Sequence, residues 1–404
     1  MSQCLVCQFE RTEVLIDFGL QPVSSHFAVS SETTVIEHDL ALAFCPQCGV
    51  VQLAQPFPCH DLVPPFAWMN YREPESHLDA VVSRICGLPG LNESSAVAGI
   101  TFKDTTTLDR LRKRGFSNVW SLEMREDLGA TNPNARIETV QALLTPAKAA
   151  EIVARHGPVD LLIVRHILEH AELPRSLMSA LAKLVAPNGY IVLEVPDCTA
   201  NLRRQDYSMV WEEHAIYFTP ETLPQVLSAA GCVNRGLEIH PFPFEDVIVL
   251  YAQKSSSISA TPAMSRLAIE QNEMVVREYA DAFGGWTTRY AFALARLTTG
   301  EKRLAAYGAG HLTCAFINFH GLSDYFAFVV DDTPHKQGLF LPKSRLPIVP
   351  RDRLTTDKIS ACFLGLTPQL EDTIIGNNSQ FSRDGGKFYS MFVDSPRSLR
   401  TLEY

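Results

Sequence analysis

The sequence predicts an α/β protein of three domains: a small metal-binding domain at residues 1–70 and two α/β domains at residues 71–254 and 255–404. Three observations lead to this prediction. Two Cys-x-x-Cys pairs stand near the N-terminus, strand-like and helix-like segments alternate through the middle, and a strand entering a Gly-x-Gly turn opens the last third. Such alternation is typical of a parallel sheet covered by helices on both faces. A chain of 404 residues is also too long for one ordinary core.

The N-terminal cysteines predict a metal site. Cys4 and Cys7 form one pair, and Cys45 and Cys48 form another, so the four thiolates can surround one zinc ion in a tetrahedron. Gly49 suits the tight turn that such a site requires. Four cysteine ligands leave no open coordination position, so we expect this zinc to stabilise the fold and not to catalyse. Redox-active thiols or core cysteines without a metal are the alternative.

The middle of the chain predicts a doubly covered parallel sheet. Short apolar segments at 96–100, 118–122, 159–164 and 190–195 predict strands, segments 107–115 and 177–185 predict helices, and residues 187–189 predict a turn. Ligands of open α/β sheets bind at the carboxyl ends of the strands. The polar residues that follow these strands are therefore the candidates for a functional site.

One such stretch, Trp211 to Phe218, places two carboxylates, an imidazole and a phenol within eight residues. It follows Glu194 and Asp197, where a buried strand is expected to emerge from the sheet. A surface loop whose aromatic residues pack back onto the core is the alternative.

The last third predicts a second nucleotide-type fold. Residues 255–262 read as a linker and 264–297 as a long helix or helix pair. A strand then enters the turn Gly308-Ala309-Gly310, and a second strand, 326–330, ends at Asp331. Glycines for the turn and an acid for a ribose make a partial dinucleotide-binding fingerprint. An α/β turn that binds nothing is an equal alternative.

Charge and hydropathy exclude two classes of partner. The formal net charge is -10 and the pI is near 5.7, whereas binding to a nucleic-acid backbone needs a basic surface. No segment approaches the ~20 apolar residues of a membrane span. The N-terminus shows no signal-peptide pattern, so we expect a cytoplasmic protein with a small-molecule substrate. The oligomeric state stays open.

Several segments, in order, resemble the nucleotide-sugar C-methyltransferases. The matching segments are residues 17–23, 38–53, 158–170, 187–189, 194–197, 213–218 and 331–348. Members of this family have three domains, the first of which binds zinc, and use S-adenosylmethionine to methylate a carbon of a nucleotide-linked deoxyketosugar. The resemblance implies a class I methyltransferase-like Rossmann fold for the central domain and a Rossmann-like C-terminal domain.

The resemblance also implies roles for individual residues. His214 falls where the family carries its catalytic histidine, and an imidazole titrates near neutral pH, as a base for a carbon acid must. Glu213 would orient that ring or bind a sugar hydroxyl, and Tyr71 would donate to the developing oxyanion. Tyr217 and Lys336 are the candidate substrate contacts, Lys336 as a point charge for a diphosphate.

The cofactor loop departs from the family. Where the family has a loop reading roughly Glu-Ile-Gly-x-Asn-Asp-Gly, residues 99–107 retain only Asp104 of that pattern, and β-branched threonines crowd the space. We expect Thr101, Asp104, Glu123 and His166 to line the cofactor site, with Glu123 at the ribose hydroxyls.

The leading hypothesis is an S-adenosylmethionine-dependent C-methyltransferase that acts on a nucleotide-linked ketosugar or a related ketone. If the altered loop does not admit the cofactor, a retained base would instead give a cofactor-independent epimerase or isomerase. A catalytically inactive binding subunit is the third reading.

Overall fold

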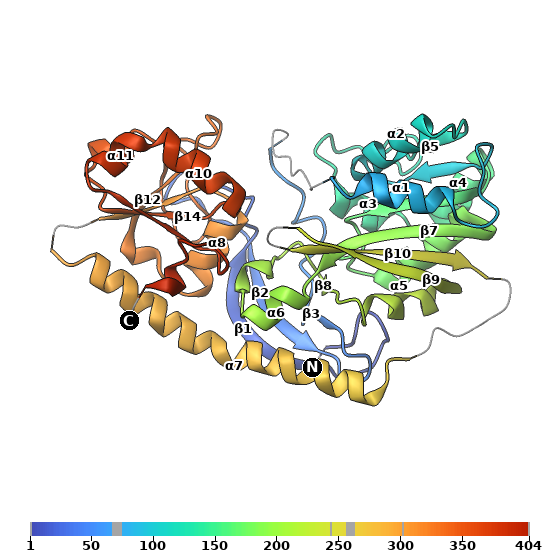
Figure 1. Ribbon diagram of the computed structural model, residues 1–404, viewed down its shortest axis with the longest axis horizontal. Helices are drawn as coiled ribbons and strands as arrows, with labels where there is room; N and C mark the ends of the chain where they lie inside the picture. The colour runs from blue at the N-terminus through green and yellow to red at the C-terminus, as the bar shows by residue number, and fades with distance from the viewer. Residues whose placement is uncertain (1, 67–74, 243–244, 256–262, 301–302, 403–404) are drawn as a thin grey trace. The chain divides into compact units, whose positions relative to one another are not determined.

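The computed structural model describes residues 2–66, 75–242, 245–255, 263–300 and 303–402, and the chain divides into two compact units (Figure 1). The first unit contains Met1–Leu15, Leu42–Thr199 and Glu213–Met274, and the second contains Ile16–Ala41, Ala200–Glu212 and Val275–Tyr404. The domain boundaries after residues 70 and 254 stay a prediction. Within the second unit, Ala28 exchanges backbone hydrogen bonds of 3.0 and 2.8 Å with Phe340, which ties this early segment to the C-terminal fold.

The first unit is built on a six-stranded sheet with the order β5-β4-β6-β7-β10-β9. The strands are β4 (Val97–Gly99), β5 (Val119–Ser121), β6 (Val159–Arg165), β7 (Val185–Asp197), β9 (Cys232–His240) and β10 (Asp246–Lys254). Strands β5, β4, β6 and β7 are parallel, and β10 runs antiparallel to both of its neighbours. All four predicted strands are present, which confirms the parallel α/β sheet.

Helices cover both faces of this sheet (Figure 1). They are α1 (Leu78–Cys86), α2 (Thr105–Lys113), α3 (Ile137–Leu143), α4 (Pro146–His156) and α5 (Pro174–Leu184), with the 3-10 helices η1 (Phe102–Asp104) and η3 (Leu223–Ala229). Side chains alternate along a strand, so Leu161 and Ile163 pack in a core with α1 and α2. Leu162 and Val164 pack on the opposite face with α4, α5 and η3.

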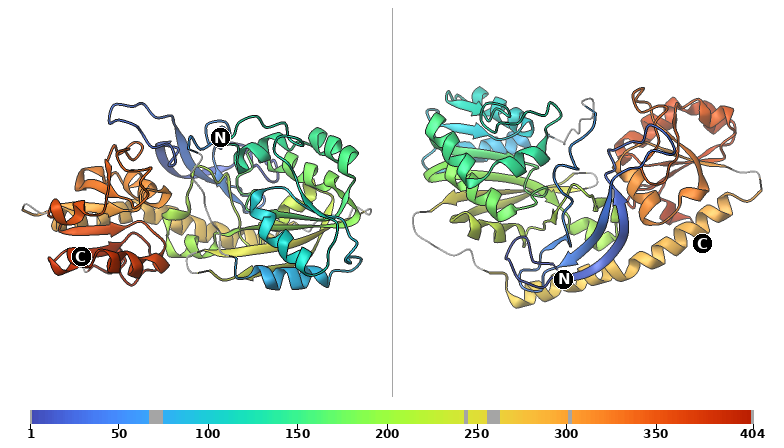
Figure 2. Two further views of the ribbon diagram at one scale, coloured as in Figure 1. Left: turned by 90° about the horizontal axis from the view of Figure 1, so that it is seen from above. Right: turned by 180° about the vertical axis from the view of Figure 1, so that it is seen from behind.

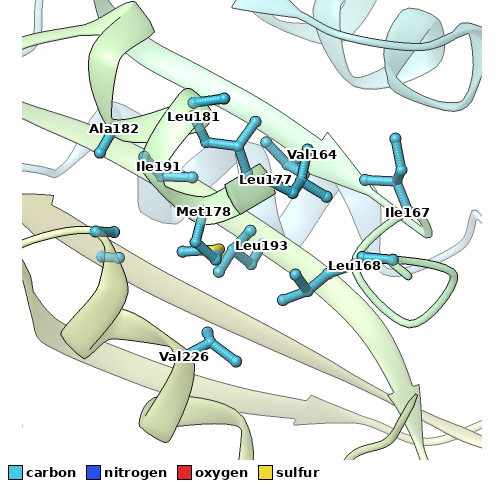
Figure 3. Close-up of a cluster of buried hydrophobic side chains, with 14 of the residues drawn as sticks. Val164, Ile167, Leu168, Leu177, Met178, Leu181, Ala182, Ile191, Leu193 and Val226 are labelled. Atoms are coloured by element: carbon cyan, nitrogen blue, oxygen red, sulfur yellow. The ribbon is translucent and has the colours of Figure 1, made fainter. Parts of the chain in front are cut away.

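The second of these cores fixes the loop that follows β6. Figure 3 shows Ile167 and Leu168 among the buried side chains of β6, β7, α5 and η3. Both side chains are at most 1% exposed. Because they anchor the loop, the polar residues beside them, His166 and Glu169, are held at the carboxyl edge of the sheet.

The predicted turn at 187–189 does not separate two elements. These residues lie inside β7, where the pairing with β6 shifts between Val159 and Leu161. Asn188 has φ 67°, and a Cβ at Gly189 would lie 2.6 Å from a methyl group of Val185. The turn signal therefore marks an irregularity within one long strand.

A four-stranded sheet has the order β1-β2-β3-β8, and its strands β3 and β8 belong to the first unit. Its strands are β1 (Glu13–Pro22), β2 (Glu37–Phe44), β3 (Val51–Leu53) and β8 (Ile216–Tyr217). Strand β3 pairs with β8 in antiparallel register, with Val51 opposite Tyr217 and Gln52 opposite Ile216. Residues soon after the N-terminal cysteines are thus hydrogen-bonded to the strand that follows His214.

The second unit contains a five-stranded, wholly parallel sheet with the order β13-β12-β11-β14-β15. Figure 2 shows this C-terminal α/β fold in orange and red, with helices beside the sheet. Its strands are β11 (Leu304–Tyr307), β12 (Phe326–Val330), β13 (Ile348–Val349), β14 (Ala361–Leu364) and β15 (Lys387–Ser390). Its α-helices are α6 (Thr199–Arg204), α8 (His311–Phe319), α9 (Arg353–Thr356), α10 (Pro368–Asn377) and α11 (Ser379–Arg383). Its 3-10 helices are η2 (Tyr207–Met209), η4 (Ser323–Tyr325) and η5 (Leu399–Thr401). The first residue of α6, Thr199, is the last residue of a first-unit segment. The predicted long helix is the single helix α7 (Arg266–Leu297), and the second α/β fold is confirmed.

Among the described residues, no helix has both the length and the apolar character that crossing a membrane requires.

Candidate active site

The four N-terminal cysteines converge as predicted. The Sγ atoms of Cys4 and Cys48 are 3.6 Å apart, those of Cys7 and Cys45 are 3.5 Å apart, and all four lie within 4.8 Å of one another. Sulfurs bound tetrahedrally to zinc at about 2.3 Å are separated by about 3.8 Å, so the donor set fits this ion. Gly49 has φ 72° and donates its N–H to the carbonyl of Cys45 at 2.8 Å, which closes the expected turn.

The segment that carries His214 is fixed by backbone hydrogen bonds on two sides. Leu53 of β3 donates to the carbonyl of Ala215 at 2.9 Å. Ala215 and Ile216 both donate to the carbonyl of Glu169, at 2.7 and 3.1 Å. The position of the His214 backbone therefore depends on the loop after β6 and on the strand that leaves the zinc site.

His214 lies in a cluster of carboxylates and imidazoles within the first unit. Its ring is partly buried and stands edge-on to the ring of His170, with 4.7 Å between centroids and an angle of 85°. Ligand atoms of Glu169, His170 and His214 lie within 4.8 Å of one another, and so do those of Glu138, His170 and Glu213. The structure thus joins the predicted pair, Glu213 and His214, to three residues that sequence reasoning missed.

A second buried network adjoins this cluster and is centred on Glu194. Its carboxylate lies 2.9 Å from Nη2 of Arg165, 3.0 Å from Nε2 of His166 and 3.1 Å from Nε2 of His77. Burial alone would raise the pKa of Glu194, but the bonds from His166 and His77 and the charge of Arg165 outweigh burial and hold its pKa well below the usual value. The other ring nitrogen of His166, Nδ1, is 3.3 Å from Glu169, so this predicted cofactor residue bridges two carboxylates.

The lowered pKa of Glu194 makes the free energy of unfolding depend on pH. Because the folded pKa lies below the unfolded value, the stabilisation is fully present above pH ~4.5 and is lost as the pH falls through the folded pKa. We expect Glu194→Gln to lower the free energy of unfolding by about 3–5 kcal/mol at pH 7, because it leaves Arg165 buried without its charged partner. Denaturant titrations at a series of pH values should show the difference from wild type shrinking below pH ~4.5. A constant difference across this range would contradict this account.

The loop after β4 folds back on Asp104. This fully buried carboxylate accepts hydrogen bonds from the backbone N–H groups of Ile100 (2.7 Å), Thr101 (2.8 Å) and Arg165 (2.9 Å). Burial raises the pKa of Asp104 to about 7 despite these bonds. A Cβ at Gly99 would lie 2.7 Å from Cβ of Asp104, so glycine is required where the loop packs most tightly.

These contacts separate the predicted cofactor residues. Asp104 braces the loop and uses both oxygens to do so, and the Thr101 hydroxyl accepts from the N–H of Lys103 at 3.2 Å. Glu123, just beyond the end of β5, has an exposed side chain. The exposed carboxylate of Glu123 is free to meet a ribose, and this contact stays a prediction. Direct cofactor contacts from Asp104 and Thr101 also stay predictions, and they would require these bonds to rearrange.

We expect Asp104→Asn to destabilise the protein by about 2–3 kcal/mol, because an amide has one acceptor oxygen and presents a donor to an N–H that then stays unpaired. Urea unfolding monitors this change. Asp109→Asn, on the exposed side of α2, is the control and should leave stability within about 0.5 kcal/mol of wild type. Equal stability of the two variants would show that Asp104 does not brace the loop.

In the second unit, Lys336 is engaged at the glycine turn. Its ammonium group donates to the carbonyl of Ala309 at 2.6 Å and lies 3.1 Å from Asp331, which in turn accepts from the N–H of Ala309 at 2.8 Å. Gly308 has φ 97° in this turn. The predicted diphosphate contact of Lys336 stays a prediction.

The polar stretch from Trp211 to Phe218 divides between the two units after Glu212. Trp211 and Glu212 belong to the second unit, where Trp211 stacks on His311 with centroids 4.6 Å apart and Glu212 accepts from the N–H of Ser24 at 2.5 Å. Tyr217 is 1% exposed, with its ring 6.5 Å from that of His214, and its substrate contact stays a prediction. Tyr71, the predicted oxyanion donor, lies outside the described residues.

Comparison with known proteins gives matches to three families in sequence order. Residues 4–62 match a zinc binding domain, 101–236 a methyltransferase domain, and 250–392 a C-methyltransferase C-terminal domain. The chain is 23% identical over 406 aligned residues to the C-methyltransferase NovU of Streptomyces niveus, an alignment that covers 96% of this chain and 94% of that protein.

Solved structures with a similar fold are more distant. The magnesium protoporphyrin IX methyltransferase of Synechocystis PCC 6803 is 15% identical, with 47% of this chain and 91% of that chain covered and a TM-score of 0.31. The 1,6-didemethyltoxoflavin-N1-methyltransferase of Burkholderia thailandensis is 14% identical, with 45% and 78% covered and a TM-score of 0.30. The three family matches, together with a C-methyltransferase relative aligned over nearly the whole chain, identify this protein as a methyltransferase.

Proposed function

We propose that the protein transfers a methyl group from S-adenosylmethionine to a carbon beside the ketone of a nucleotide-linked sugar, with His214 as the base. The observation that carries this proposal is the position of His214: a partly buried imidazole at the carboxyl edge of the sheet, edge-on to His170 and next in sequence to Glu213. The C-methyltransferase relative supports a carbon acceptor.

The proposed reaction needs a base and a means of holding negative charge. His214 takes the proton from the carbon, and the electron pair of the broken C–H bond moves to the ketone oxygen as an enolate. S-adenosylmethionine, when bound, supplies the methyl group that this carbon receives. In this proposal Glu123, whose side chain is exposed, accepts hydrogen bonds from the ribose hydroxyls.

A specific observation also favours a second reaction. The N–H groups of Ile100 and Thr101, at the turn where a cofactor would approach the backbone, are already bonded to Asp104. A protein that cannot open this turn would still remove and return a proton, which gives an epimerase or isomerase.

The test follows the methyl group and the proton separately. The full-length protein is incubated with sugar nucleotides that carry a ketone, in heavy water, with and without S-adenosylmethionine labelled on its methyl group. Incorporation of label into the sugar supports the methyl transfer. Deuterium incorporation that needs no cofactor, without any methyl transfer, would overturn it in favour of the epimerase. The absence of both would remove both reactions.

A further inference from the structure

We propose that Glu138, His170 and Glu213 bind a divalent metal ion, at a site separate from the four cysteines. These residues come from the first turn of α3, the loop after β6 and the segment before β8. Each offers one ligand atom, and these atoms lie within 4.8 Å of one another. Convergence of three segments far apart in sequence on one point is what a built metal site requires.

The distance between the side chains of His170 and Glu138 suits two ligands of one metal ion better than a direct hydrogen bond. Nδ1 of His170 lies 3.4 Å from Oε1 of Glu138, and this nitrogen makes no hydrogen bond within the described chain. Nitrogen and oxygen ligands at about 2.0–2.1 Å from a tetrahedral ion lie about 3.4 Å apart. The separation therefore suits two ligands of one metal ion.

Burial makes an unneutralised cluster costly. Glu138, His170 and Glu213 are 4, 7 and 5% exposed. Close by, both carboxylate oxygens of Glu169 are buried and accept no hydrogen bond from the described residues, and its one ion-pair contact is with His166 at 3.3 Å. Arg165 is already paired with Glu194. The buried carboxylate oxygens of Glu169 beside this cluster, which lack a hydrogen-bond donor among the described residues, favour a bound cation, because isolated buried charge is strongly destabilising.

The ligand set indicates the kind of ion. Two carboxylates and one imidazole suit Mn²⁺, Fe²⁺ or Zn²⁺, and three protein ligands leave positions open for water or substrate. His214 is not one of the three ligands, so it stays available as the base. The metal site does not depend on the reaction. Its role, which is to hold the ketone oxygen and stabilise the enolate, rests on the proposed function.

The test uses Mn²⁺ as the probe, because this ion prefers oxygen and imidazole ligands and does not compete for the four thiolates. Electron paramagnetic resonance counts the free Mn²⁺ remaining when the zinc-loaded, full-length protein is titrated. We expect one Mn²⁺ per chain in addition to one zinc, and affinity lowered at least tenfold in His170→Asn and in Glu213→Gln. Glu151→Gln, on the exposed side of α4, is the control and should bind as wild type does.

Circular dichroism and zinc content establish that each variant is folded. Failure of the wild type to bind Mn²⁺ or a second zinc ion would overturn the site, and so would folded variants with wild-type affinity. If Mn²⁺ binds and no methyl transfer or proton exchange occurs, the site stands and the proposed function fails. If methyl transfer survives complete removal of the second ion while zinc is retained, the role assigned to the ion is overturned.

Discussion

His214→Asn is expected to lower the rate of methyl transfer by about 10²–10⁴-fold, the usual contribution of a positioned general base. Asparagine keeps hydrogen-bonding capacity and approximate size but cannot accept a proton from carbon. Deuterium incorporation into the sugar should fall by the same factor, because both reactions begin with the same proton. The measurement is the initial rate of each process at saturating substrate.

The control for this variant is His60→Asn. The His60 side chain is 78% exposed and lies 3.5 Å from the carboxylate of its sequence neighbour Asp61. We expect His60→Asn to keep the wild-type rate. A His214→Asn protein that is folded and methylates at the wild-type rate would contradict the assignment of the base.

Cys45→Ser is expected to cause the largest loss of stability. Structural zinc sites contribute about 10–16 kcal/mol of apparent binding free energy in isolated zinc fingers, and binding there is coupled to folding. In this chain Cys45 begins the turn that Gly49 closes, and β3 begins at Val51. Loss of zinc should therefore free β3, release the carbonyl of Ala215 from Leu53, and abolish activity along with stability.

Thermal unfolding, zinc content and methyl transfer are measured together on Cys45→Ser and on wild type treated with a strong chelator. Cys86→Ser is the matched control, because Cys86 lies on the same unit, is exposed and takes no part in the metal cluster. It should retain zinc and the wild-type rate. Full activity in protein from which zinc has been removed would show that β3 holds its place without the metal.

Local patterns in the sequence were sufficient for the four parallel strands of the first sheet, for two strands of the second α/β sheet and for the zinc site. Cys-x-x-Cys spacing places two metal ligands on one turn. The tertiary fold therefore only has to bring the two turns together. The strands were predicted from apolar runs bounded by polar residues, and β12 has the predicted bounds. The segment 187–189 was misread because a Pro-Asn-Gly turn signal does not distinguish the end of a strand from an irregularity within it.

The candidate site could be predicted only in part, because its members come together through tertiary contacts. Glu138 is 32 residues before His170 along the chain and carries no motif, so nothing local pointed to it. Asp104 and Lys336 were predicted to contact ligands. In the structure, Asp104 binds backbone N–H groups and Lys336 binds the carbonyl of Ala309. These internal partners depend on backbone geometry, which the sequence does not reveal. Glu213 and His214 are neighbours in the sequence, and their catalytic roles stay predictions.

The pairing of β3 with β8 limits how the central domain can be expressed separately from the N-terminal segment. Val51 and Gln52 are the only strand partners recorded for Tyr217 and Ile216 among the described residues. Cutting the chain after residue 53, or grafting the methyltransferase fold into another protein from residue 75 onward, would leave this two-residue strand as an open edge. A truncated or grafted protein that keeps His214 in position must also contain the cysteine turn. The metal-binding segment and the methyltransferase fold therefore form one structural module.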